Sequence, residues 1–267
     1  MRLLKINPDS SFSLTSVVGN KIPRYAILSH TWEIDNQEVT FRDLVDGLGE
    51  SKVGYKKIRF CGEQATMDGI QYIWVDSCCI DQSSSAELAE AINSMFRWYR
   101  NAVKCYVYLS DVPNADIDLR AFCQSRWFTR GWTLQELLAP RSVEFFSREG
   151  QKLGDKQSLE LEIHHRTGIP VLALQHPGGL TQFSVEERMA WTTGRETTIE
   201  EDQAYCLLGI FDVHLPLIYG EGREHALRRL RKEIFTEHAM SSKGIETALF
   251  AIRKLIRCSN SEMLLDL

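Results

Sequence analysis

Short apolar runs rich in β-branched and aromatic residues recur through the first half of the chain and alternate with longer segments of helical character. The runs are YAILSH at 25–30, YIWVDS at 72–77 and CYVYLSD at 105–111, and the helical segments are 52–69 and 85–101. Runs of this length and composition predict buried strands. A strand, helix, strand, helix, strand order is typical of a parallel sheet, so we expect a small doubly wound α/β unit.

A fourth apolar run, SVEFFS at 142–147, extends this pattern. It follows WTLQELLA, a short predicted helix that Pro140 ends, and it predicts another strand. We expect this α/β core to occupy residues 1–150.

The second half has a different texture and predicts an α-rich extension over 151–240. Residues 164–184 are irregular, with a Gly-Gly pair near a proline. Ser184 then precedes Glu187 by three residues, a capping-box signature, and a basic helix is predicted from Arg223. Residues 241–267 predict an amphipathic helix whose apolar face needs a partner.

Composition narrows the function classes. The chain has 267 residues and a net charge of −5, which gives no broad electrostatic attraction for nucleic acid. No apolar run is long enough for a signal peptide or a membrane span, so we expect a cytoplasmic protein. The seven cysteines form no CxxC pair, which argues against a disulfide framework or a zinc site; the adjacent Cys78 and Cys79 remain a candidate redox pair.

Polar and aromatic residues gather where the predicted strands end, which is where ligands bind in open parallel sheets. The stretch SRWFTRGWTLQELLAP adds aromatic rings, guanidinium groups and one carboxylate, the three features that a dinucleotide requires. The candidates are Ser29, His30, Trp32, Asp76, Asp81, Trp98, Arg126, Trp127, Arg130, Trp132 and Glu136.

Each of the central candidates also has a structural interpretation. Trp132 beside a helix could belong to the core, and Arg130 could be neutralised by Asp76 or Asp81. Glu136 lies among leucines, where an unpaired carboxylate is costly, so it is either paired or functional. The chain has no Walker A, GxGxxG, HExxH or GxSxG motif, and its histidines have no metal-ligand spacing.

The blocks RYAILSHTW, YIWVDSCCIDQ, SMFRWYRNAVKCYVYLSDV and SRWFTRGWTLQELLAP resemble the successive motifs of the fungal HET (heterokaryon incompatibility) domain, and the resemblance continues to about residue 235. It implies an effector of programmed cell death in fungal innate immunity, often the amino-terminal part of an NLR-type receptor whose other domains follow.

HET domains in turn resemble TIR domains, which implies a flavodoxin-like, mostly parallel sheet and cleavage of NAD at the nicotinamide–ribose bond. The resemblance assigns the catalytic glutamate to Glu136. It implies stacking by Trp98 or Trp132, pyrophosphate binding by Arg126 or Arg130, and contacts of Ser29 and His30 with ribose or phosphate. NAD is then a substrate, and we expect no tightly bound cofactor and no metal.

Three hypotheses follow. The first is an NAD glycohydrolase that acts on self-association, and the second is a non-catalytic signalling module on the same fold. The third is a redox sensor that uses Cys78 and Cys79, although nothing nearby in the sequence favours a thiolate.

Overall fold

The computed structural model describes residues 1–17, 22–34, 36–113, 119–176 and 178–237. The predicted amphipathic helix over 241–267 lies outside these residues. Among the described residues, no helix combines the length and apolar character needed to cross a bilayer.

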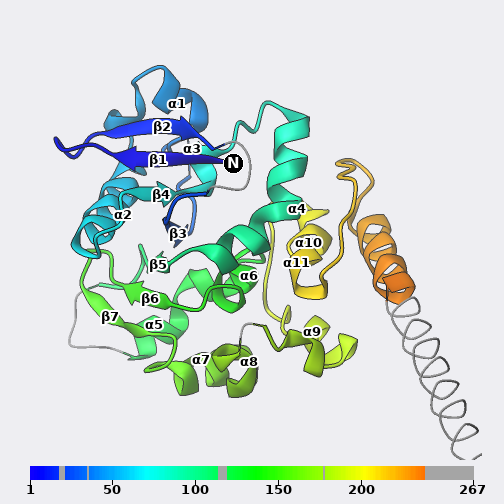
Figure 1. Ribbon diagram of the computed structural model, residues 1–267. Helices are drawn as coiled ribbons and strands as arrows, with labels where there is room; N and C mark the ends of the chain where they lie inside the picture. The colour runs from blue at the N-terminus through cyan, green and yellow to red at the C-terminus, as the bar shows by residue number, and fades with distance from the viewer. Residues whose placement is uncertain (18–21, 35, 114–118, 177, 238–267) are drawn as a thin grey trace, which may run out of the picture.

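A seven-stranded sheet forms the centre of the molecule, in the order β2-β1-β4-β3-β5-β6-β7 (Figure 1). Its middle strand β3 (Ala26–His30) pairs in parallel with β4 (Tyr72–Trp74) and β5 (Lys104–Tyr108), and β6 (Val143–Phe146) pairs in parallel with β5. These four strands confirm the predicted ones. Their side chains are almost all buried, as expected for strands covered on both faces.

The edges of the sheet differ from the prediction. The hairpin β1 (Arg2–Ile6) and β2 (Phe12–Ser16) joins β4 antiparallel, and β7 (Lys152–Asp155) joins β6 antiparallel. Three of the six strand pairings are therefore antiparallel, so the α/β fold is confirmed but the sheet is mixed rather than mostly parallel. Both edges consist of short, half-buried strands with a weak apolar signature.

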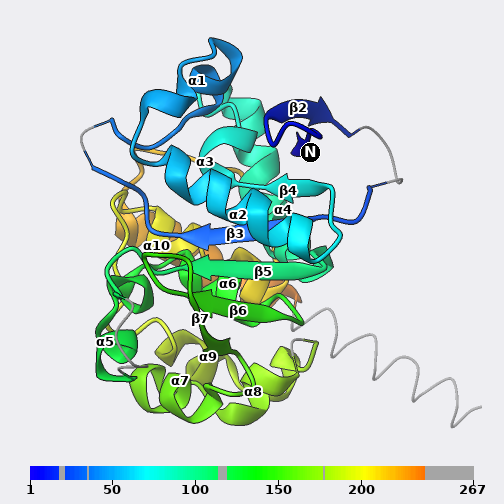
Figure 2. The ribbon, with the colours of Figure 1, turned by 90° about the vertical axis from the view of Figure 1, so that its left-hand side faces the viewer.

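Helices cover both faces of the sheet. Helix α2 (Tyr55–Met67) lies on one face, and α4 (Ser85–Asn101) and α6 (Thr133–Leu138) lie on the other (Figure 2). Ser84 caps α4 by accepting a hydrogen bond from the amide of Glu87. The predicted strand at 72–77 ends early, because α3 (Asp76–Cys79) begins directly after β4. Short elements complete this half: α1 (Phe41–Val45), the 3-10 helices η1 (Gly49–Ser51) and η2 (Arg126–Thr129), and α5 (Leu119–Gln124).

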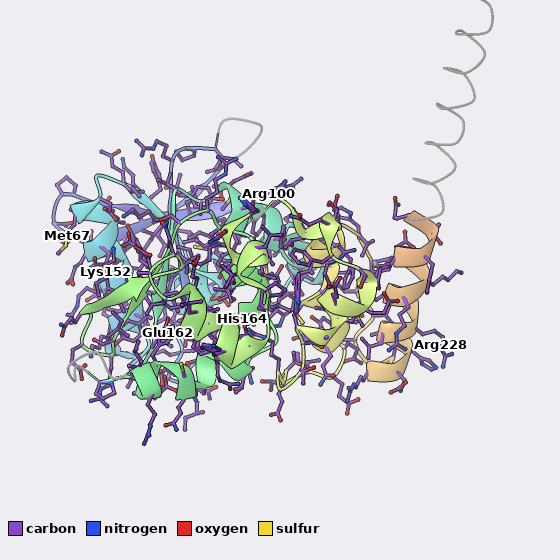
Figure 3. The ribbon with its side chains drawn as sticks, turned by 90° about the horizontal axis from the view of Figure 1, so that it is seen from below. Met67, Arg100, Lys152, Glu162, His164 and Arg228 are labelled. Atoms are coloured by element: carbon purple, nitrogen blue, oxygen red, sulfur yellow. The ribbon has the colours of Figure 1, made fainter. Side chains whose placement is uncertain are left out.

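The part of the chain after residue 150 begins with β7, which belongs to the sheet although the predicted core ends at residue 150, and it continues as a series of helices. The Ser184–Glu187 capping box opens α9 and is confirmed in both directions. The chain is helical again over 223–237, and Figure 3 shows Arg228 of this segment at the opposite end of the molecule from Met67 and Lys152. The elements are α7 (Glu160–Thr167), α8 (Val171–Gln175), η3 (Leu180–Gln182), α9 (Val185–Ala190), α10 (Asp202–Tyr205) and α11 (Leu208–Phe211).

The two halves share one hydrophobic core. It extends from the sheet to α10 and α11, and α11 packs closely on α4. Gly209 of α11 makes this approach possible, because a Cβ atom there would lie 2.0 Å from the Cβ of Phe96. The extension over 151–237 is thus packed onto the sheet and its flanking helices.

Candidate active site at the carboxyl ends of the parallel strands

Glu136 lies in a buried hydrogen-bonded row that links three elements. Its side chain, in α6, accepts a hydrogen bond from the hydroxyl of Ser29, the penultimate residue of β3. Ser29 Oγ in turn accepts a hydrogen bond of 2.8 Å from the indole Nε1 of Trp127 in η2. Glu136 is 3% exposed and Ser29 is fully buried. The row therefore fixes the carboxyl group against the end of the central strand.

Tyr99 is a further member of this row that the sequence analysis missed. Its hydroxyl donates to the carbonyl oxygen of Leu28 at 3.0 Å, and the same hydroxyl group lies beside the Glu136 carboxyl group. Tyr99 is fully buried on the sheet-facing side of α4, four residues after Met95. That helical spacing predicts a core residue and gives no sign of the polar contact.

Burial raises the pKa of Glu136 to about 8, and the nearby Asp76 carboxylate contributes to the rise. The hydrogen bond from Ser29, the neighbouring Tyr99 hydroxyl and the charge of Arg195 act in the opposite direction but do not cancel it. No ion pair among the described residues includes Glu136. The paired alternative is therefore not observed, and the group is mostly protonated at neutral pH.

His30 lies on the opposite face of β3 from Ser29, as alternation along a strand requires. Its Nδ1 is 3.9 Å from Asp76 Oδ1, and its Nε2 is 3.6 Å from Glu38 Oε1. Glu38 also bonds Lys57 Nζ of α2 at 2.6 Å. Although burial opposes it, the contacts with His30 and Lys57 hold the pKa of Glu38 well below its usual value. Glu38 and Lys57 form a buried ion pair that the sequence did not reveal.

Asp76 is the first residue of α3, and its carboxylate lies near His30 on one face of the sheet and near Glu136 on the other. Burial raises its pKa in spite of the neighbouring His30. Its Oδ2 accepts a hydrogen bond of 2.9 Å from the indole of Trp32, a residue that is 44% exposed. Asp76 is thus shared by the buried carboxyl site and the exposed aromatic residue beside it.

Arg126 supplies a guanidinium group at the same edge. Its Nη2 donates to Thr31 Oγ1 at 3.1 Å and to the Trp32 carbonyl at 3.3 Å, and its backbone amide donates to Asp111. Its side chain is exposed, and no ion pair among the described parts of the chain includes it. Its guanidinium group is therefore accessible to an anion.

Four predicted site residues lie elsewhere. Trp98 is 6% exposed and packs on Trp74, with ring centroids 5.5 Å apart. Arg130 donates to Thr198 Oγ1 at 2.9 Å instead of pairing with Asp76 or Asp81, and Trp132 donates to Asp202 at 3.1 Å. Both are thus held by the helical extension, while Asp81 lines a separate cavity.

The redox hypothesis based on Cys78 and Cys79 gains no support. The described residues contain no group of three or more potential metal ligands. Cys78 and Cys79 are both buried in α3, rather than on opposite faces of a strand. Burial raises the pKa of Cys78 well above its ordinary value, which is the reverse of what a reactive thiolate needs.

The fold and the site define an α/β protein with a buried acidic group at the carboxyl end of its central strand. Residues 25–120 match the family described as Heterokaryon incompatibility protein (HET). The Vegetative incompatibility protein HET-E-1 of Podospora anserina is 60% identical over 242 residues, which cover 88% of this chain. The chain therefore carries a HET domain, as its motifs predicted.

These matches cover only part of the relative and only part of this chain, which limits the conclusions they allow about its activity. The aligned part of the chain spans 18% of the length of the Podospora anserina protein. The family match ends at residue 120 and does not reach Glu136. No solved structure matches the chain. The likeness to TIR domains accordingly stays a prediction.

Proposed function

We propose that this HET domain is an effector of heterokaryon incompatibility that hydrolyses NAD at the nicotinamide–ribose bond. The observation that carries the chemistry is Glu136, a buried carboxyl group without an ionic partner among the described residues, positioned by Ser29 and Tyr99. The name of the Podospora anserina relative supports the biological role. The domain would act in the cytoplasm as part of a longer, NLR-type protein.

The raised pKa suits a cationic substrate. Burying a protonated carboxyl group costs little free energy. When the positively charged nicotinamide–ribose unit approaches, it favours the ionised form of the Glu136 carboxyl group. When the glycosidic bond breaks, nicotinamide leaves as a neutral molecule with the bonding electron pair, and positive charge develops on the ribose. The carboxylate stabilises that charge, and water then adds to C1′ and releases a proton.

Other groups at this edge suit the rest of the dinucleotide. The exposed indole of Trp32 offers a face for stacking, and the guanidinium of Arg126 offers a partner for pyrophosphate. Because Glu136 is 3% exposed, the substrate reaches it only after the covering residues move. We propose that self-association produces this opening and so acts as the switch.

A non-catalytic signalling module is the second candidate. The same low exposure of Glu136 favours it, because a buried, hydrogen-bonded carboxyl group can serve the fold alone. In that case the exposed residues Trp32 and Arg126 would contact a protein partner.

The test is release of free nicotinamide from NAD at rising protein concentrations. We expect release to grow more steeply than linearly with concentration and to fall at least about 100-fold in Glu136→Gln, the scale expected when a group that stabilises transition-state charge is removed. Trp127→Phe, which removes the donor to Ser29, should give an intermediate loss. The control is Glu90→Gln, on the exposed side of α4.

Two results would overturn the proposal. Absence of nicotinamide at every concentration would leave the signalling module. Release that is equal in Glu136→Gln and in the parent chain would keep an enzyme but exclude Glu136 as its catalytic carboxylate.

A further inference from the structure

A cavity of about 420 Å³ lies between α1 and the segment that follows β4, apart from Glu136, Ser29 and Trp127. Of the residues predicted for the active site, only Asp81 lines it. Its volume falls within the range of small-molecule sites. The lining residues are Thr40, Phe41, Arg42, Val45, Asp46, Ser77, Ile80, Asp81, Gln82 and Ser83.

Part of the lining is apolar and includes an aromatic ring. Phe41, Val45 and Ile80 provide it, and Val45 is 62% exposed although it is a large apolar residue. The guanidinium of Arg2 lies over the Phe41 ring, 4.3 Å from its centroid, and Arg2 is itself paired with Glu87. These contacts hold the Phe41 ring in place, so this part of the apolar lining is preformed.

The charged part of the lining carries an excess of negative charge. Asp46 and Asp81 contribute two carboxylates, and Arg42 contributes one guanidinium, which lies 3.4 Å from Asp46. Hydrogen bonds from Ser83 lower the pKa of Asp81, so this carboxylate stays ionised. The net negative charge of the lining disfavours a phosphate group and favours a ligand that carries hydrogen-bond donors.

Ser77 adds an unsatisfied polar group to the lining. The residue is 1% exposed, and its hydroxyl oxygen has no hydrogen-bond partner among the described residues. Buried polar atoms are normally paired, and an exception calls for an explanation. A hydroxyl group can both donate and accept, and this oxygen lies just beneath the cavity surface, so a ligand group can complete it once the covering atoms shift.

We infer that this cavity binds a nucleoside without phosphate groups. A nucleoside combines a flat base, which suits the apolar lining, with ribose hydroxyls, which donate to carboxylates. The missing phosphate follows from the negative charge of the lining. Ser77 directly follows Asp76, so the bound ligand lies beside the candidate active site, but the inference does not depend on NAD hydrolysis.

The test measures binding of adenosine and adenosine monophosphate to the full chain by isothermal titration calorimetry. We expect adenosine to bind at least about fivefold more tightly than its monophosphate, the effect of one Coulomb contact of about 1 kcal/mol near a solvated surface. Val45→Trp, which fills the mouth, should weaken adenosine binding at least about tenfold. The matched control is Val53→Trp, at a valine that is 61% exposed and does not line the cavity.

A charge variant tests the selectivity separately. Asp46→Lys changes the charge of the lining from −1 to +1, so the monophosphate should then bind at least as tightly as adenosine, whereas Glu90→Lys should leave the preference unchanged. The inference would be overturned if no adenosine binding is detected up to about 10 mM, a concentration that corresponds to a very weak dissociation constant. It would also be overturned by equal adenosine affinity in Val45→Trp and Val53→Trp, or by a monophosphate that binds the parent chain as tightly as adenosine.

Discussion

The state of Glu136 makes a prediction about stability that needs no knowledge of a substrate. Replacing Glu136 with Gln keeps the size and the hydrogen-bonding shape of the side chain but removes its titration. Because burial raises the pKa of this carboxyl group from 4.5 to about 8, the folded chain binds its proton more tightly than the unfolded chain does. The folded state is therefore weakened progressively as pH rises from about 4.5 to about 8, and Glu136→Gln escapes this loss.

The magnitude follows from the two pKa values. The two pKa values differ by about 3.5, and each pKa unit corresponds to about 1.36 kcal/mol, so the loss of unfolding free energy reaches about 5 kcal/mol once pH exceeds 8. Between pH 6 and pH 9 the difference in unfolding free energy between Glu136→Gln and the parent chain should grow by about 3 kcal/mol. This is a large fraction of the stability of an ordinary domain, so the effect is measurable.

The assay is urea unfolding of both chains at several pH values, followed by tryptophan fluorescence. The comparison uses the difference between the chains, because other groups titrate equally in both. Glu90→Gln, at an exposed position, should track the parent chain across the whole range. If the curves of Glu136→Gln and the parent chain run parallel from pH 6 to pH 9, Glu136 is ionised in the folded protein and our account of its burial is wrong.

Two further substitutions test the packing around the site. Lys57→Met leaves Glu38 buried without its ammonium partner and should lower the free energy of unfolding, measured by urea denaturation, by about 3–5 kcal/mol. Lys56→Met, on the exposed side of α2, should lower it little, and equal losses in the two variants would contradict the buried pair. Gly209→Ala forces a methyl group against Phe96 and should cost at least about 1–3 kcal/mol, seen as a lower thermal midpoint, while Gly178→Ala, which meets no atom within 4 Å, serves as its control.

The central strands could be predicted because they are buried on both faces. The runs that became β3 and β5 are continuous and apolar, and such runs stand out in a single sequence. The hairpin β1–β2 and the edge strand β7 could not be predicted in the same way. Their residues are partly exposed, and their pairing depends on contacts with β4 and β6 that no local pattern encodes.

The candidate site was predictable in its location more than in its contacts. Strand order places the ends of β3 and β4 together, which accounts for the meeting of Ser29, His30 and Asp76 at one edge. The hydrogen bond between Ser29 and Glu136 joins residues 107 positions apart, and only the folded chain shows it. Likewise, no local feature separates the buried Lys57 from the exposed Lys56 beside it.

The segment just before α6 is held from outside the sheet. The Gly131 amide donates to the Glu196 carbonyl at 2.8 Å, and the Glu196 amide donates to the Thr129 carbonyl at 2.7 Å. Arg195, which is partly buried, adds a bond of 2.8 Å to the Arg130 carbonyl. A fragment that stops at residue 150 would retain the ends of all four parallel strands and yet lack the partners that fix the approach to Glu136. Inactivity of such a fragment would say nothing about the chemistry of the whole domain.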